Sequence, residues 1–246
     1  MRVLITGGKS VLARAIADQL SSAQGVTEVR TTDRRGQNAD IRNASKNFFH
    51  CTLGDDEATA ALVAGMDQII HLEPFVDDSA ADGDEWVDHA TRCTYNLLHA
   101  AAVAGCKRCV CVSSLAVFNS TDRDYAISPG WRTQPRPVKG ELGPHLSEFV
   151  CREFAHVGAI AVAVARIGDL VESSTPLTER PRFWVRKADA VSGLVELVTA
   201  APPPAEDQGF FVGGGTANMC ARMQQPLRLL LLHLIHLRLL SQVSPP

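Results

Sequence analysis

The stretch RVLITGGKSVLARAIADQL, residues 2–20, decides how this chain folds. Its first five residues form an apolar, β-branched run, and two glycines follow directly after it. Apolar residues then recur at every fourth position from Leu12 to Leu20, which places one apolar stripe along a helix. The stretch therefore predicts a strand over 2–6, a tight turn, and an amphipathic helix over 11–20.

The turn between this strand and this helix lies where a bound anion is best stabilised. The first N–H groups of a helix have no acceptor within the helix, and the helix dipole places partial positive charge there. In the glycine pattern of dinucleotide-binding turns, Gly7 takes the first place, Ser10 the second and Ala13 the third. The β-carbon of Ser10, at the second place, crowds a pyrophosphate that approaches the turn. The Ser10 hydroxyl can nevertheless donate a hydrogen bond to a phosphate oxygen. The predicted cofactor-binding residues here are Thr6, Gly7, Gly8, Ser10, Val11 and Leu12.

A second phosphate motif overlaps the same turn. Gly8-Lys9-Ser10 has the ending of the phosphate-binding loop of nucleoside triphosphatases. That loop requires a glycine five residues before Gly8, and Val3 stands there inside the strand. We therefore prefer the dinucleotide interpretation.

The end of the second β-rich run supplies a candidate for ribose recognition. Asp33 and Arg34 follow this run directly. A carboxylate about twenty residues past the glycine turn can accept hydrogen bonds from the adenosine ribose, which selects NAD, whereas arginines can hold the 2′-phosphate of NADP. We expect NAD rather than NADP, with both residues in the site. The alternative is a solvated turn of mixed charge.

Strand-like and helix-like segments alternate along the rest of the chain, which is typical of βαβ units and a parallel sheet. Strands are predicted over 2–6, 27–32, 48–52, 67–72, 108–113, 159–165 and 209–212. Helices are predicted over 11–20, from 55 to Gly65, and over about 84–104, 146–157 and 188–200. The expected fold class is α/β, a Rossmann-type doubly wound parallel sheet of about seven strands with helices on both faces. One domain would span 1–220, with small substrate-side segments after about 166.

Composition is that of an ordinary soluble domain. Hydrophobic residues make up 46%, charged residues 21%, and the net charge is −3, so a nucleic-acid partner is not expected. The seven cysteines lie in apolar runs, which favours a reducing compartment, and we expect the cytoplasm. Cys106-x-x-Cys109-x-Cys111 could suggest a metal or redox site, but no second pair with ligand spacing follows, so we interpret these as structural thiols and expect no metal.

The last segment, 221–246, differs from the rest. From Pro226 it carries leucine on every side of a helix, over about 14 residues, which is short of the ~20 that span a bilayer. We expect a packed or poorly ordered appendage and no membrane span; a membrane-surface or partner-docking helix is the alternative. His233 and His236 share a helix face without further ligands. A homodimer is also considered, and association through this tail is a further hypothesis.

The order of these motifs resembles the extended short-chain dehydrogenase/reductase superfamily, in particular its NAD-dependent epimerase/dehydratase branch. The resemblance covers about 1–215 and includes the glycine turn, the central helix around Asn96 and the strand ending at Ser114. It implies that Asp55 accepts from the adenine ring, and that Leu72 and Glu73 line the cofactor. It also implies that Arg166-Ile167-Gly168, Trp184 and Asp189 belong to the substrate side, with a faint similarity to sugar-acid dehydrogenases.

The residues that carry the chemistry in this superfamily are a serine and a Tyr-x-x-x-Lys pair. Ser114 matches the serine, but no Tyr-x-x-x-Lys occurs, since the only tyrosines are Tyr95 and Tyr125. With one residue deleted, His145 falls at the tyrosine and Glu148 at the lysine; without a gap, residues 140 and 144 fall there, a glycine and a proline.

Histidine can move a proton near neutral pH, so the candidate catalytic residues are Ser114 and His145. A carboxylate at Glu148 would raise the pKa of a neighbouring acid. The alternative is that His145 is a helix-start or surface residue. Two functions follow: an NAD-dependent oxidoreductase, epimerase or dehydratase acting on a sugar-like or other small hydroxylated substrate, and a catalytically silent NAD-binding sensor or scaffold.

Overall fold

The computed structural model describes residues 1–34, 47–72, 85–122, 124, 127 and 131–200, together with the backbone of 210–215. Its main feature is a seven-stranded sheet in the order β3-β2-β1-β4-β5-β6-β9, in which every neighbouring pair is parallel. The strands are β1 (Arg2–Thr6), β2 (Glu28–Asp33), β3 (Phe48–His50), β4 (Gln68–His71), β5 (Arg108–Ser114), β6 (Ala161–Ile167) and β9 (Phe210–Gly215). Chain order reverses between β1 and β4, where ligands bind in doubly wound sheets.

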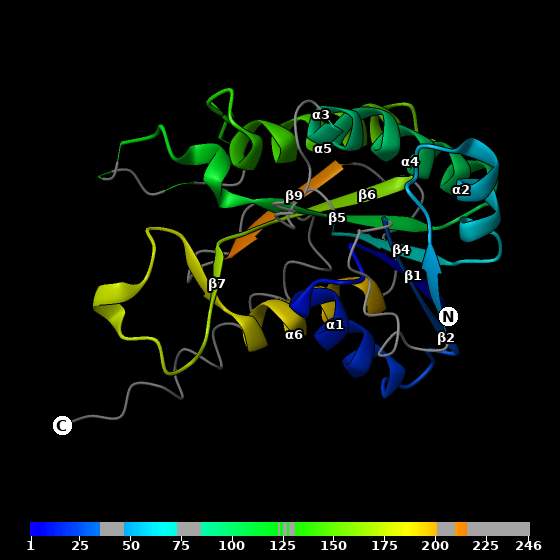
Figure 1. The fold of residues 1–246 in the computed structure, drawn as a ribbon, viewed down its shortest axis with the longest axis horizontal. Coiled ribbons are helices and arrows are strands. Elements are labelled where there is room, and N and C mark those ends of the chain that lie inside the picture. The colour runs from blue at the N-terminus through cyan, green and yellow to red at the C-terminus, as the bar shows by residue number, and fades with distance from the viewer. Residues whose placement is uncertain are drawn as a thin grey trace.

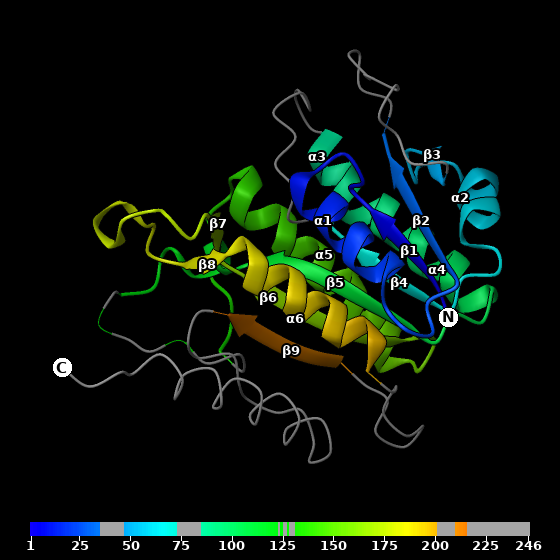
Figure 2. The same ribbon diagram turned by 90° about the horizontal axis from the view of Figure 1, so that it is seen from below.

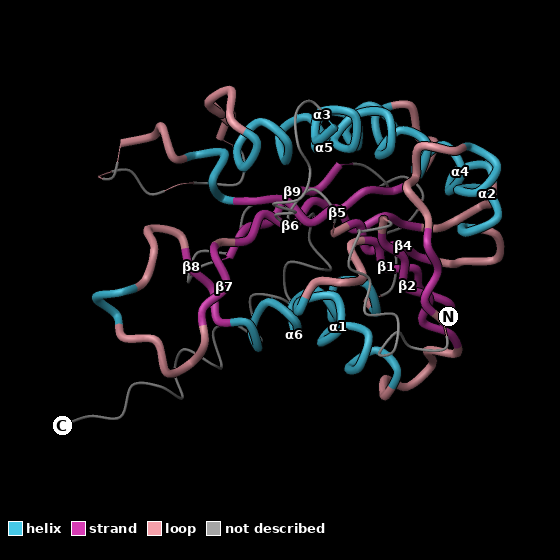
Figure 3. The backbone as a smooth tube through the Cα atoms, in the orientation of Figure 1, coloured by secondary structure: helices cyan, strands magenta, loops and turns pink. Residues whose placement is uncertain are grey.

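Helices cover both faces of this sheet (Figure 1). One face carries α1 (Val11–Ser21) and α6 (Lys187–Thr199), and the other carries α2 (Asp56–Val63), α3 (Glu85–Asp88), α4 (Thr94–Val103) and α5 (Lys139–His156). A π-helical turn, His89–Cys93, joins α3 to α4, and 3₁₀ turns occupy Leu115–Phe118 and Leu177–Glu179. The layered arrangement of strands between helices is plain in Figure 3.

The strands divide the core into two halves, because successive side chains point to opposite faces. Leu4, Ile69 and Cys109 pack toward α2, α4 and α5, whereas their neighbours Ile5 and Ile70 pack toward α1 and α6. Figure 2 shows α6 lying along the sheet. Both halves contain fully buried side chains, so the central strands are held from both sides.

The predicted Rossmann-type fold is confirmed, and each predicted strand is present with boundaries that shift by a few residues. The sequence analysis did not predict β7 (Asp169–Val171) and β8 (Trp184–Arg186), which form a separate two-stranded parallel sheet. Each of these strands has three residues, which are too few to show an alternating apolar pattern.

The prediction that a helix starts near residue 146 was wrong. α5 begins at Lys139 and includes Pro144 in its second turn. Proline normally excludes helical backbone from the residue before it, because the proline ring collides with that residue's β-carbon. Gly143 stands before the proline and has no β-carbon, so the helix continues through it. His145 consequently lies inside α5 and is not at its start.

Candidate cofactor site and adjoining polar cluster

The glycine turn is shaped by its contact with the end of β2. Gly7 has φ +69°, a left-handed conformation that glycine adopts without strain. The Gly8 N–H donates to the Thr32 carbonyl at 2.8 Å, and a β-carbon on Gly8 would lie 3.1 Å from the same oxygen. The absence of a β-carbon on Gly8 therefore lets the turn lie against β2 without displacing the strand.

Asp33 is fixed beside this turn by two backbone donors. Its Oδ2 accepts from the Lys9 N–H at 2.8 Å and its Oδ1 from the Arg34 N–H at 2.7 Å. Lys9 Nζ also donates to the Arg34 carbonyl at 2.8 Å. The structure thus brings together the predicted glycine turn and the predicted ribose carboxylate, which the sequence separates by more than twenty residues.

The start of α1 presents its amides at the same edge. Ser10 caps the helix by accepting from the Ala13 N–H at 3.0 Å, so the amides of Val11 and Leu12 are the first-turn donors for an anion. The first turn of α1 contains no acidic residue that would compete for them. Val11 is 56% exposed, whereas Leu12 packs into the core. This arrangement fits the pyrophosphate of a dinucleotide.

Beneath the turn lies a buried histidine that the sequence analysis did not single out. His71 Nδ1 is 2.8 Å from Thr6 Oγ1, and its Nε2 is 3.1 Å from Thr94 Oγ1. Complete burial lowers the pKa of His71 to about 3, with a smaller lowering by His89, so the ring is neutral. The Leu72 N–H donates to Thr6 Oγ1 at 3.2 Å. The imidazole therefore links the end of β1 to α4.

Two further predicted cofactor residues have different outcomes. The Asp55 carboxylate caps α2, because its Oδ1 accepts from the Ala58 N–H at 2.7 Å. Its predicted role toward adenine stays a prediction. Glu73 lies outside the described residues.

The two candidate catalytic residues bind different partners. Ser114 Oγ accepts from the Ala116 N–H at 3.1 Å and caps the 3₁₀ turn after β5, which leaves its O–H free to donate elsewhere. His145 Nδ1 is 2.7 Å from Thr133 Oγ1. The half-buried His145 is thereby anchored through one ring nitrogen.

The pKa of His145 is lowered, mainly because burial disfavours the charged ring. Glu148 raises this pKa, as predicted for a nearby carboxylate, but burial outweighs it, and Arg152 and Arg166 lower the pKa further. The ring is therefore neutral near pH 7.

Two of the charges that act on His145, Glu148 and Arg166, form a buried ion pair. Arg166 on β6 donates from Nε to Glu148 Oε1 at 2.8 Å and from Nη2 to Oε2 at 2.6 Å, and both side chains are nearly inaccessible. Ser113 donates to Glu148 Oε1 at 2.5 Å. Neither alignment of α5 places a cation at the lysine position of the family, but Arg166 on β6 supplies one beside Glu148.

A second buried carboxylate, Glu141, lies one helical turn before His145. It accepts from the Arg136 N–H at 2.8 Å, from Arg136 Nε at 2.9 Å and from Asn119 Nδ2 at 3.3 Å. The hydrogen bond with Arg136 is the main cause of the lowered pKa of Glu141. Sequence reasoning missed Glu141 because α5 was predicted to begin after it; acidic residues in a first helical turn are the signal that could have found it.

The six described cysteines are buried free thiols. Burial raises the pKa of Cys109 well above its ordinary value, and a hydrogen bond with Cys111 does the same for Cys151. Over the described residues no His, Cys, Asp and Glu side chains cluster as a metal site would require. None of the helices in the described part of the chain combines the length and hydropathy that crossing a bilayer requires.

Comparison with known proteins identifies the class. Residues 3–136, more than half of the chain, match the model of the NAD dependent epimerase/dehydratase family. The chain belongs to this family. The match confirms the resemblance found in the sequence and the expectation of an NAD-dependent protein of the epimerase or dehydratase class. No protein with a curated description matches the chain in sequence.

Solved structures share the fold. A mutated uronate dehydrogenase is 26% identical, with a TM-score of 0.69 over 89% of this chain and 74% of that chain. Uronate dehydrogenase from Agrobacterium tumefaciens is 24% identical, with a TM-score of 0.72 over 100% of this chain and 90% of that one. The UDP-glucose 4-epimerase of Thermus thermophilus, in complex with NAD, is 17% identical, with a TM-score of 0.68 over 89% and 78%.

Proposed function

We propose that this protein binds NAD and acts as an oxidoreductase, epimerase or dehydratase on a sugar-like or other small hydroxylated substrate. The observation that carries the proposal is the bond between Asp33 Oδ2 and the Lys9 N–H, because it sets a ribose-binding carboxylate beside the helix start that would hold a pyrophosphate. Structures similar to this one were solved as complexes with NAD, among them a point mutant of the A. tumefaciens uronate dehydrogenase.

NAD is preferred to NADP in this proposal for an electrostatic reason. The Asp33 carboxylate would repel a 2′-phosphate and accept hydrogen bonds from the ribose hydroxyls. Two cations at the same edge, Lys9 and Arg34, would instead favour a 2′-phosphate. Lys9 Nζ donates to the Arg34 carbonyl. Calorimetric titration of the full chain with NAD, NADH, NADP and NADPH tests both points. We expect binding with NAD preferred over NADP, and failure of all four ligands to bind would refute the proposal.

In the proposed reaction, bound NAD supplies the hydride acceptor or donor. Ser114 donates its hydroxyl proton in a hydrogen bond to the substrate oxygen, and neutral His145 takes the proton of the substrate hydroxyl. In the tautomer that this role requires, His145 Nδ1 donates to Thr133 Oγ1, which leaves Nε2 as the atom that receives the proton. Reduction of NAD by a sugar acid or alcohol, lost in Ser114→Ala, is the expected result.

A second candidate function is a catalytically silent NAD-binding sensor or scaffold. The observation that favours it is that Arg166 is engaged by Glu148 at both Nε and Nη2, so the buried cation that acts on His145 is committed to a structural pair. NAD binding without turnover across a panel of alcohols, uronates and nucleotide sugars would support this candidate.

We further propose a homodimer in the cytoplasm. Both α4 and α5 carry exposed apolar side chains, among them Tyr95 (51% exposed), Val103 (77%) and Phe149 (49%). Arg152 and Glu153 on α5 carry opposite charges beside them, which suits contact with a second copy of the same surface. The buried thiols support a reducing compartment.

A further inference from the structure

The turn after β3 holds a leucine in a conformation that leucine rarely adopts. Leu53 has φ +58°, and it is the one described residue other than glycine with a positive φ. Its side chain is fully buried. A β-carbon crowds the backbone in the left-handed region, so such a residue persists only where its surroundings impose it, often at a binding site.

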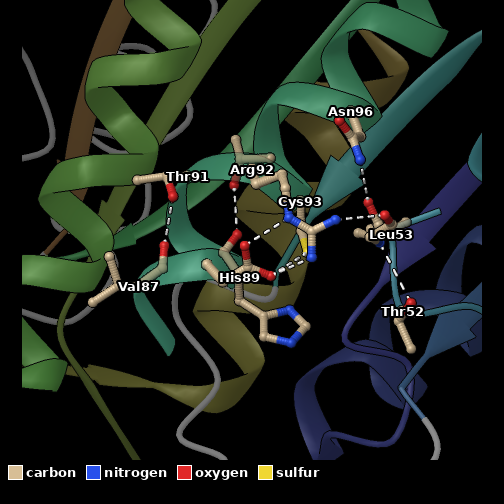
Figure 4. A network of polar contacts seen from close by, with 11 residues as sticks. Thr52, Leu53, Val87, His89, Thr91, Arg92, Cys93 and Asn96 are labelled. Carbon is tan, nitrogen blue, oxygen red and sulfur yellow. Dashed lines mark hydrogen bonds and ion pairs between the residues drawn. The ribbon is translucent and has the colours of Figure 1, made fainter. Parts of the chain in front are cut away.

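Two side chains from the helix across the turn impose this conformation (Figure 4). Asn96 Nδ2 donates to the Leu53 carbonyl at 3.0 Å, and Arg92 Nη1 donates to the Gly54 carbonyl at 2.6 Å. The Gly54 N–H bonds back to Thr52 Oγ1 at 3.4 Å. The residues from Thr52 to Gly54 are therefore held to the helical segment that contains Arg92 and Asn96.

Hydrogen bonds hold the planar guanidinium of Arg92 in one orientation. Its Nε donates to Asp88 Oδ1 at 2.7 Å and its Nη2 to Asp88 Oδ2 at 2.6 Å, while Nη1 is bound to Gly54. Guanidinium donors point outward within the plane, so these bonds occupy the edges and leave the faces without polar partners. The side chain is 54% exposed. Asp88 also raises the pKa of Arg92, which therefore keeps its charge.

The turn that binds this cation lies next to the predicted ribose site. β3 pairs with β2, and the Cys51 N–H donates to the Asp33 carbonyl at 3.1 Å. The turn from Thr52 to Gly54 therefore begins directly after Cys51, the residue that is hydrogen-bonded to the end of β2 at Asp33. A base attached to a ribose at Asp33 would lie on the side of the sheet edge where this turn begins.

We propose that the face of the Arg92 guanidinium stacks on the adenine ring and forms one wall of the purine pocket. A planar cation attracts the π-face of an aromatic ring, and arginine stacks on bases where lysine cannot. This inference rests on the proposed NAD binding and adds the residue that recognises the purine. Gly54 completes the wall, since a β-carbon there would lie 3.0 Å from Arg92 Nη2 and displace the guanidinium.

Binding of nucleotide fragments to the full chain tests the proposal. The probes are AMP and nicotinamide mononucleotide, titrated calorimetrically against the wild type, Arg92→Ala, Arg92→Lys and Gly54→Ala. We expect each substitution to weaken AMP binding, Arg92→Ala by roughly threefold to tenfold, and to leave nicotinamide mononucleotide unchanged. Arg132→Ala, which removes an exposed arginine from the segment before α5, is the control and should bind both probes like the wild type.

Arg92→Lys separates stacking from simple support of the turn, because lysine can still donate to the Gly54 carbonyl but has no flat face. AMP binding by Arg92→Lys equal to that of the wild type would overturn the proposal while the proposed function stands. A larger loss for NADP than for NAD in Arg92→Ala would assign the cation to a 2′-phosphate and also overturn it. Absence of any AMP or NAD binding by the wild type would remove the proposed function, and this inference with it.

Discussion

Gly8 shows how one absent β-carbon shapes the cofactor turn. The nearest neighbours of an added β-carbon are the Thr32 carbonyl at 3.1 Å, Thr31 Cβ at 3.2 Å and Phe48 Cε2 at 3.3 Å. Two of these atoms belong to strand β2 and give way little. Gly8→Ala should therefore lower the free energy of unfolding by about 1–3 kcal/mol and weaken NAD binding, as measured by urea denaturation and calorimetry.

Gly193→Ala is the matched control for this substitution. An added β-carbon on Gly193, inside α6, meets nothing within 4 Å. Alanine should therefore stabilise the helix by about 0.5–1 kcal/mol and leave NAD binding unchanged. Equal stability of Gly8→Ala and the wild type would show that the turn does not press on β2.

His71 gives the stability of the protein a dependence on pH. Its pKa is about 3 in the folded protein and 6.5 in the unfolded chain, so between these values only the unfolded chain binds the proton. The contribution of His71 is complete above pH 6.5 and falls as the pH falls, by about 1.4 kcal/mol per pH unit.

Urea denaturation at several pH values between 4 and 6 measures this slope. The free energy of unfolding of His71→Gln should depend on pH less steeply than that of the wild type, by about 1.4 kcal/mol per pH unit, which corresponds to one bound proton. The carboxylates contribute equally in both proteins. Parallel slopes for His71→Gln and the wild type would mean that His71 is accessible to water.

At the scale of elements, the Glu148–Arg166 pair fastens α5 to the sheet. Glu148 comes from α5, Arg166 from β6 and Ser113 from β5, so one carboxylate joins three elements. Removing either member leaves the other charge buried, and we expect Glu148→Ala or Arg166→Ala to cost about 3–5 kcal/mol in urea denaturation. Replacing both by methionine should recover most of that loss, though not all, because Ser113 then loses its acceptor.

The exposed pair Arg152–Glu153 is the comparison for this effect. Both side chains are about half exposed, so Glu153→Ala should cost less than about 1 kcal/mol. If Glu148→Ala costs no more than Glu153→Ala, water reaches the buried pair and it does not hold α5 in place.

At the scale of the whole molecule, we expect two copies to associate through α4 and α5. Tyr95→Glu combined with Phe149→Glu should halve the mass that light scattering measures at micromolar concentration, because buried carboxylates without partners oppose association. Leu177→Glu, at another exposed apolar position, should leave the mass unchanged. Loss of the dimer on deletion of 222–246, with the α4 and α5 substitutions silent, would place the contact in the C-terminal tail instead.

The sequence alone determined the type of fold and the cofactor end of the site. Hydrophobic periodicity and a glycine turn are local signals, and they were enough to predict the seven strands of the main sheet, without β7 and β8, and to place Gly7 and Gly8 near Asp33. The order of the strands follows from the same pattern, because parallel connections allow few topologies.

Only the tertiary structure decided what surrounds the candidate catalytic residues and the purine turn. Arg166 reaches Glu148 across a gap of eighteen residues, and Arg92 reaches Gly54 across thirty-eight. Arg92 has a local signal in Asp88 one turn earlier, but nothing local connects it to Gly54. Such contacts depend on how two elements pack, which no periodic pattern encodes. The start of α5 was missed for a similar reason, since the proline rule yields where the preceding residue has no β-carbon.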